Sequence, residues 1–131
     1  MNVRSSLAAL ITLLSAAAAV AAPPAVPALP ADRGRDVFRR VCAPCHGAGP
    51  GTDGAMFLPG TAALAAKYQG ALPGPLEDRG GLTAEVLRRF IRHGTGAMPM
   101  FRKTEVSDAQ INEIAAYLRQ SAARTQHASS R

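Results

Sequence analysis

Two thiols and an imidazole stand within the five residues Cys42-Ala43-Pro44-Cys45-His46, and these side chains define the chemistry open to the chain. On one helical turn both thiols face the same way, so both can add across the vinyl groups of one porphyrin as thioethers. His46 follows directly and can supply an imidazole nitrogen to the iron as its proximal ligand. The spacing therefore predicts covalent attachment of a c-type haem, here called haem c.

Three other uses of paired cysteines fit the sequence less well. A thioredoxin-like dithiol is expected within a βαβ pattern, and no such pattern surrounds this motif. A structural zinc site needs a second spaced pair of ligands, which His93 and His127 do not form. A disulfide between Cys42 and Cys45 would close a tiny loop and restrain the unfolded chain little. Both cysteines of the chain lie in this motif, which leaves haem attachment as the interpretation.

An electron carrier needs a second axial ligand, so that no substrate binds the iron and little rearranges on reduction. The sequence offers four candidates: Met98, Met100, Met56 and His93. Met98 is favoured because Pro99 keeps it out of the helical region, and Gly94 and Gly96 let the backbone lie close to a flat ligand. The metal ligands are thus predicted as His46 and Met98. A thioether paired with histidine raises the reduction potential relative to two histidines.

Apolar residues recur with a helical period, and this predicts an all-α chain. The first helix is expected at 33–41, where Val37 and Val41 lie one turn apart, and it leads directly into the haem motif. Glycines and prolines predict loops at 47–60 and 70–81. Between these loops we expect a short helix at 61–68 with Thr61 as its cap.

The two remaining helices carry clearer signals. Thr83 can cap a helix at 84–92. Its inward side chains are expected to be Val86, Leu87, Phe90 and Ile91. In the last helix, Ser107 and Gln110 form a capping box that precedes an apolar stripe of Ile111, Ile114, Ala115 and Leu118. We expect the first and last helices to pack on each other.

The amino-terminal residues 1–22 have the three parts of a secretory signal peptide. Arg4 lies in a basic n-region, an apolar run spans 7–20, and Ala19-Val20-Ala21 is a small-residue cleavage site. The apolar run is short for a bilayer span and has no basic flank after it, so a retained membrane anchor is the weaker interpretation. Since bacteria attach this haem outside the cytoplasmic membrane, the sequence predicts a periplasmic protein.

The rest of the chain divides into three parts. Residues 23–31 are mostly proline and alanine and predict an extended linker. We expect 32–120 to form one small domain and 121–131 a flexible tail. With no tryptophan, two tyrosines and four phenylalanines, the domain has few large rings of its own, so a buried haem would supply the rigid apolar body it lacks.

The formal net charge of +6 comes mainly from arginine. A basic surface can steer an acidic partner protein and raise the encounter rate. Nucleic acid binding is not predicted, because the charge comes without a recognition motif and export removes the usual partner.

Beyond the motif, the chain resembles class I cytochromes c over residues 32–120. Gly34 and Phe38 on the first helix and Tyr117 on the last are similar to the helix-crossing contact of that family. The resemblance implies a small all-α cytochrome c fold, with three to five helices wrapped around one covalently bound haem.

Three further segments carry family roles through the same resemblance. Gly74-Pro75 is similar to the segment whose proline carbonyl accepts the hydrogen bond of the proximal imidazole, which would orient His46. The resemblance also implies that Arg79 pairs with a haem propionate. Met98-Pro99 resembles the loop of the distal ligand.

A narrower likeness concerns the partner. GPLEDRGGL and IRHGTGAMPMF resemble the cytochrome subunit of p-cresol methylhydroxylase-type flavocytochromes, which takes single electrons from an FAD subunit that oxidises alkylphenols. The interval 50–72 is longer than that subunit leads one to expect. Similar small cytochromes also serve quinoprotein dehydrogenases and pass electrons on to a further cytochrome or oxidase.

Two functions from different classes follow. The first is a periplasmic monohaem electron carrier, not itself an enzyme, which serves as acceptor or subunit for a dehydrogenase. The alternative is a haem enzyme or gas-binding sensor with an open distal iron site, for which only His93 could serve as a distal base.

Overall fold

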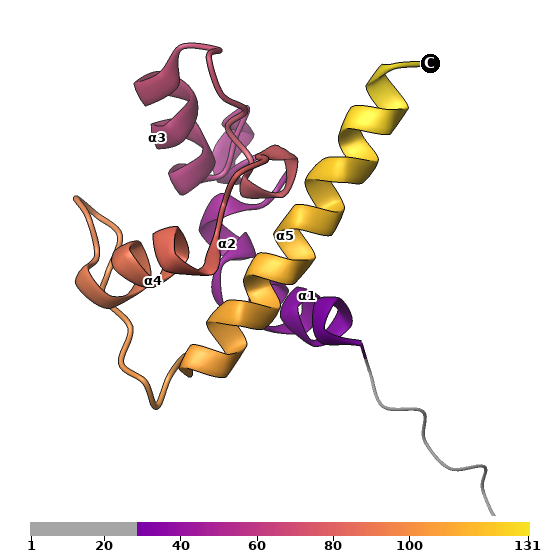
Figure 1. Cartoon of the computed structure of the whole chain (residues 1–131). Helices are drawn as coiled ribbons and strands as arrows, with labels where there is room; N and C mark the ends of the chain where they lie inside the picture. Colours follow the sequence, from indigo (N-terminus) through magenta and orange to yellow (C-terminus); the bar gives the residue numbers. More distant parts are fainter. Residues whose placement is uncertain (1–28) are drawn as a thin grey trace, which may run out of the picture.

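A computed structural model describes residues 29–131 and shows helices that alternate with loops (Figure 1). In chain order the elements are α1 (Pro30–Val41), α2 (Ala43–His46), the 3₁₀ turn η1 (Thr52–Gly54), α3 (Pro59–Tyr68), the 3₁₀ turn η2 (Leu76–Asp78), α4 (Ala84–His93) and α5 (Asp108–Ser129). No strand occurs among residues 29–131, and the prediction of an all-α fold is confirmed. The predicted signal peptide and most of the predicted linker lie outside the described residues.

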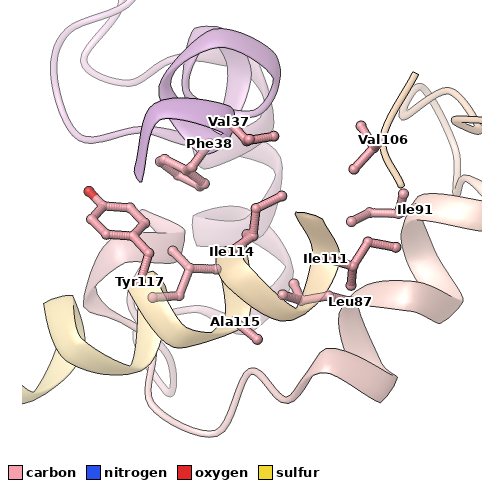
Figure 2. Packing of buried hydrophobic residues seen from close by; sticks show 10 residues of the cluster. Val37, Phe38, Leu87, Ile91, Val106, Ile111, Ile114, Ala115 and Tyr117 are labelled. Carbon is pink, nitrogen blue, oxygen red and sulfur yellow. The ribbon is translucent and has the colours of Figure 1, made fainter. Parts of the chain in front are cut away.

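The crossing of α1 and α5 is the centre of the fold, as predicted. Gly34 makes it possible, because a Cβ atom there would collide with the backbone carbonyl of Glu113 in α5. One turn further along, the rings of Phe38 and Tyr117 pack at 5.5 Å between centroids (Figure 2). The Tyr117 hydroxyl also donates a hydrogen bond to the Glu77 carboxylate, which ties η2 to this crossing.

The apolar core extends from this crossing to α4. Ile111, Ile114 and Leu118 of α5 are at most 1% exposed, so the predicted stripe is confirmed. On α4, Leu87 and Ile91 are buried against this core (Figure 2).

The inward face of α4 is narrower than predicted. Val86 and Phe90 are 37% and 41% exposed, so the expectation that both point inward was wrong. Leu87 and Ile91 lie one turn apart and are the buried apolar residues of α4 in this core. Periodicity located the helix but could not show which edge of its apolar face is covered.

The predicted caps of the last two helices are both present. The Thr83 side chain accepts a hydrogen bond from the Val86 N–H at 3.2 Å. The Ser107 hydroxyl accepts from the Gln110 N–H at 3.2 Å, and the Gln110 side chain accepts from the Ser107 N–H at 2.8 Å. These bonds satisfy backbone donors that a helix start otherwise leaves open.

Three helix boundaries differ by more than one residue from the sequence-based prediction. α1 begins at Pro30 and therefore includes the last two residues assigned to the linker. α3 begins at Pro59, so Thr61 lies inside the helix and is not its cap. Proline at the first helical position explains both starts, since its fixed φ suits a helix and its missing N–H costs nothing there.

The third difference is the carboxyl-terminal segment. Residues 121–131, predicted as a tail outside the domain, continue α5 to Ser129. Ala122 is buried, and the Thr125 hydroxyl donates a hydrogen bond to Asp78 at 3.0 Å. Within residues 29–131, none of the helices combines the length and the apolar character that a bilayer crossing requires.

Candidate haem site

The cysteine pair lies on a single turn that follows α1 directly. The Cys42 carbonyl accepts hydrogen bonds from the N–H groups of Cys45 at 3.1 Å and of His46 at 2.9 Å, so α2 is closed onto Cys42. The two thiols are free, with Cys42 partly buried against the core and Cys45 exposed. Burial raises the pKa of the Cys42 thiol to about 11.

The His46 ring is partly buried, and one of its nitrogens lies without a polar partner in the described part of the chain. Its Nδ1 atom is buried and has no hydrogen-bond partner among residues 29–131. Burial, and secondly the charge of Arg79, lower the pKa of the imidazole. Both effects favour the neutral imidazole, which is the form that can coordinate iron.

Met98 is held in a tight loop after α4. Its N–H donates to the Thr95 carbonyl at 2.9 Å and its carbonyl accepts from the Thr95 N–H at 3.1 Å. Gly94 and Gly96 have φ values of 66° and 55°, which β-carbon-bearing residues rarely adopt. A Cβ at Gly94 would also lie 2.6 Å from the Met98 carbonyl oxygen. The two glycines therefore shape the turn itself.

The structure separates the four candidates for the second ligand. Met98 is partly buried and packs against the apolar core, whereas Met100 and Met56 are 61% and 78% exposed. His93 is exposed at the end of α4, with its Nδ1 atom 2.8 Å from the Arg89 carbonyl oxygen. Among the four candidates, Met98 is the one whose thioether side chain packs against the core.

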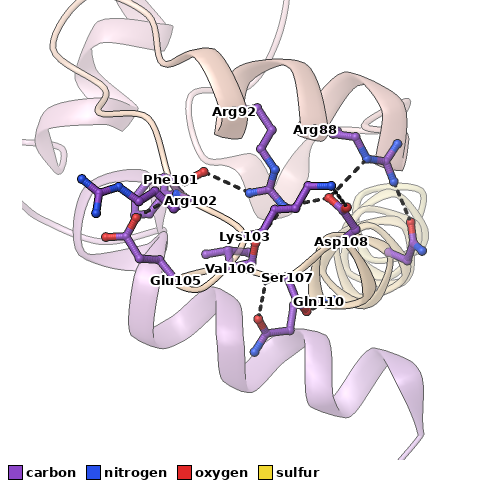
Figure 3. A network of polar contacts seen from close by, with 11 residues as sticks. Arg88, Arg92, Phe101, Arg102, Lys103, Glu105, Val106, Ser107, Asp108 and Gln110 are labelled. Carbon is purple, nitrogen blue, oxygen red and sulfur yellow. Dashed lines mark hydrogen bonds and ion pairs between the residues drawn. The ribbon is translucent and has the colours of Figure 1, made fainter.

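Arg92 secures the segment that follows this loop (Figure 3). Its guanidinium donates to the carbonyl oxygens of Phe101 at 3.0 Å and Val106 at 2.8 Å, and to the Asp108 carboxylate at 2.7 Å. The Phe101 N–H in turn donates to the Ile91 carbonyl at 2.7 Å. The chain that carries Met98 is thus tied to α4 on one side and to the start of α5 on the other.

Pro75 and Arg79 lie around η2. The Pro75 carbonyl accepts from the Asp78 N–H at 3.4 Å, and its predicted bond to His46 stays a prediction. Arg79 is 6% exposed, and its Nε donates to the Pro73 carbonyl at 2.5 Å. Its guanidinium carbon lies 4.6 Å from the centroid of the Tyr68 ring, a cation–π contact. Its Nη2 is buried and finds no hydrogen-bond partner among the residues that the structure describes.

The places of Gly60 and Thr61 at the site were not predicted from the sequence. A Cβ on Gly60 would lie 2.6 Å from both Cε1 and Nδ1 of His46. Thr61 is completely buried, and its hydroxyl donates to the Gly47 carbonyl at 2.9 Å. The Leu58-Pro59 step, which predicts a helix start at 59, was the local signal that would have placed both residues in the first turn of α3.

Comparison with known proteins gives one match. A family model described as cytochrome c oxidase, cbb3-type, subunit III, matches residues 29–118. The chain belongs to this family of c-type cytochromes. No curated protein and no solved structure matches the chain.

The residues of this cytochrome fit a covalently bound haem c, the cofactor that the family implies. Two free thiols, and an imidazole whose lowered pKa favours the neutral form, lie on one turn and are the donor set that attachment needs. Arg79 carries a buried and unpartnered N–H group, which an anionic propionate could satisfy. Cys42 and Cys45 would hold the porphyrin, His46 its iron, and Met98 the remaining axial position, the last being a prediction that rests on its burial and its loop.

Proposed function

We propose that this c-type cytochrome is a periplasmic carrier of single electrons in which His46 and Met98 are the two axial ligands. When bound, the haem supplies a one-electron ferric–ferrous couple. The observation that carries the proposal is the Met98 loop, closed by two backbone hydrogen bonds to Thr95 and packed on the core. A loop fixed in this way would hold Met98 at the iron and limit rearrangement of the ligand when the charge changes.

The partner we propose is a dehydrogenase, with an FAD-dependent enzyme for phenolic substrates as first choice and a quinoprotein as second. The support is the resemblance of 74–82 and 91–101 to the flavocytochrome subunit, together with the basic charge of the chain. As the downstream acceptor we propose a further cytochrome or an oxidase; the family description, which names an oxidase subunit, is in keeping with an oxidase. A basic surface would accelerate encounter with an acidic partner in a salt-dependent way.

Location follows from the proposed export. The predicted signal peptide at 1–22 and the need for attachment outside the cytoplasmic membrane both support the periplasm. Fractionation of cells that express the full chain would show the haem-containing protein in the periplasmic fraction. Recovery in the cytoplasmic fraction would contradict this part of the proposal.

Carbon monoxide binding to the reduced protein tests the electron-carrier role. The wild-type protein is expected to resist carbon monoxide because Met98 fills the axial position, and Met98→Ala is expected to bind it readily. Met100→Ala is the matched control, since this exposed thioether lies two residues away, and it should behave as wild type. Fast carbon monoxide binding to the wild-type protein would favour the haem enzyme or gas sensor with an open iron.

A further inference from the structure

The helix α3 lies in the segment 50–72. This interval is longer than the resemblance to the flavocytochrome subunit predicts. Figure 1 shows α3 apart from the crossing of α1 and α5. Its inward residues Thr61, Ala65 and Tyr68 follow the helical spacing i, i+4, i+7. Each of these side chains contacts a segment that carries a residue of the haem site.

The amino-terminal end of this stripe is bound to the haem motif. Thr61 is 0% exposed, and its hydroxyl lies 2.9 Å from the carbonyl oxygen of Gly47 and 3.4 Å from that of Cys45. These carbonyls belong to the end of α2, where a helix leaves acceptors without partners. Thr61 therefore fixes the backbone on both sides of His46.

Gly60 contacts the imidazole itself. A side chain at this position would lie 2.6 Å from Cε1 and from Nδ1 of His46, and 2.9 Å from the Cys45 carbonyl oxygen. Since a Cβ essentially never approaches another heavy atom below 3.0 Å, the ring occupies the space that any other residue would need. The His46 ring thus rests on the bare backbone of the first turn of α3.

The other end of the stripe contacts the segment 73–79. A Cβ at Gly74 would lie 3.1 Å from the Thr61 methyl group and 3.3 Å from the Ala65 Cβ, so the two backbones are in close contact. Tyr68 lies under the guanidinium of Arg79. α3 is consequently packed between the proximal histidine and the segment that contains Pro75 and Arg79.

We infer that α3 is a positioning element for the proximal ligand, with Gly60 and Thr61 as the positioning residues. Gly60 restricts the imidazole to one ring orientation, and Thr61 fixes the backbone from which the ring projects. Orientation of a ligating histidine by its surroundings tunes its basicity and so the potential of the metal. The inference depends on His46 as a ligand and is independent of the second ligand and of the redox partner.

The test compares five variants of the haem-loaded full chain: two test variants, a matched control for each, and one rescue variant. Gly60→Ala is matched by Gly80→Ala, where a Cβ would meet only the Gln126 side chain at an ordinary 3.5 Å. Thr61→Val, which keeps the shape and removes the hydroxyl, is matched by the same change at the exposed Thr104. The readouts are the hyperfine-shifted proton NMR resonances of the ferric protein, whose pattern depends on the orientation of the axial imidazole, and the reduction potential.

We expect Gly60→Ala and Thr61→Val to retain both thioether bonds, to displace the His46 resonances and to shift the reduction potential. Thr61→Ser, which restores the hydroxyl, should return both readouts toward the wild-type values. The two control variants should give the same resonances and the same potential as the wild type. Loss of thermal stability without a change in resonances or potential would reduce α3 to a structural role and overturn the inference. A wild-type spectrum without resonances of a ligated His46 would refute it together with the haem assignment.

Discussion

Substitution of Gly34 by alanine should destabilise the fold, although intrinsic helix propensity predicts the opposite. In an isolated helix this change is worth about 1 kcal/mol in favour of alanine. At the α1–α5 crossing, however, the added Cβ would collide with the carbonyl of Glu113 and lie 2.9 Å from the backbone nitrogen of Ile114. These are backbone atoms, so no rotamer change can relieve the collision and the two helices must separate.

The size of the effect follows from these opposing contributions. Overpacking of a tight contact costs about 1–3 kcal/mol, and a backbone collision belongs at the upper end of that range. With about 1 kcal/mol of propensity set against it, Gly34→Ala should lower the free energy of unfolding by about 2 kcal/mol. For a domain of this size the loss corresponds to a fall in Tm of roughly 8–16 °C.

The measurement is denaturant unfolding of the haem-loaded protein, followed by circular dichroism, with thermal unfolding in parallel. Gly80→Ala is the control, and it should change stability by less than about 0.5 kcal/mol. A Gly34→Ala protein as stable as wild type, or more stable, would show that α1 and α5 do not approach as closely as described. Such a result would remove the packing argument for the cytochrome fold.

Three further outcomes are expected. Tyr117→Phe should lose about 1.5–3 kcal/mol of stability, since it removes a hydrogen bond to a carboxylate; burial, and then the bond to Glu77, raise the pKa of Tyr117 to about 12. Wild-type stability should therefore fall as the pH rises from the ordinary tyrosine pKa of 10.0 towards 12, and a denaturation series should show less of this fall in Tyr117→Phe. Hydrogen bonds, from Arg92 first and from Lys103 second, lower the pKa of Asp108, so its stabilising contribution is present above pH 3.8 and is lost as the pH falls through the lowered value. Asp108→Asn should therefore reduce the loss of stability at acid pH, and an unchanged loss would contradict this account. In the reduced haem-free protein a short iodoacetamide pulse at pH 8 should label the exposed Cys45 first, because a pKa of about 11 leaves only about a thousandth of Cys42 as thiolate. Mass spectrometry of the labelled peptides would give the order, and labelling of Cys42 first would contradict the prediction.

Local signals in the sequence were sufficient for much of the fold. The cap at Thr83 and the capping box at Ser107 and Gln110 each involve residues three apart, so the sequence alone contains both partners. The α1–α5 crossing was predictable through a resemblance carried by Gly34, Phe38 and Tyr117, and the structure confirms it. Gly34 shows why the crossing can be predicted from sequence, since only a residue without a side chain permits the close approach of α1 and α5.

What the sequence could not provide depends on distant contacts. Thr61 suits a helix cap locally, but its hydroxyl bonds to Gly47, fourteen residues earlier, and the helix begins two residues before it. The continuation of α5 depends on burial of Ala122 and on a hydrogen bond between Thr125 and Asp78, neither of which composition reveals. The exposure of Phe90 likewise reflects where α5 lies.

The candidate site divides in the same way. Cys42, Cys45 and His46 follow from spacing alone, because attachment needs them on one turn. Gly60, which contacts the His46 ring, and the buried N–H group of Arg79 became visible only when α3 and η2 were placed in space.

The most direct test of the central claim is the absorption spectrum of the oxidised and reduced exported protein, measured for the wild type, Met98→Ala and Met100→Ala. The account predicts a c-type reduced spectrum for all three and a weak far-red sulfur-to-ferric-iron band in the wild type. This band should persist in Met100→Ala, whose side chain is 61% exposed, and disappear in Met98→Ala. A haem spectrum that lacks the band in the wild type, or keeps it in Met98→Ala, would contradict ligation by His46 and Met98.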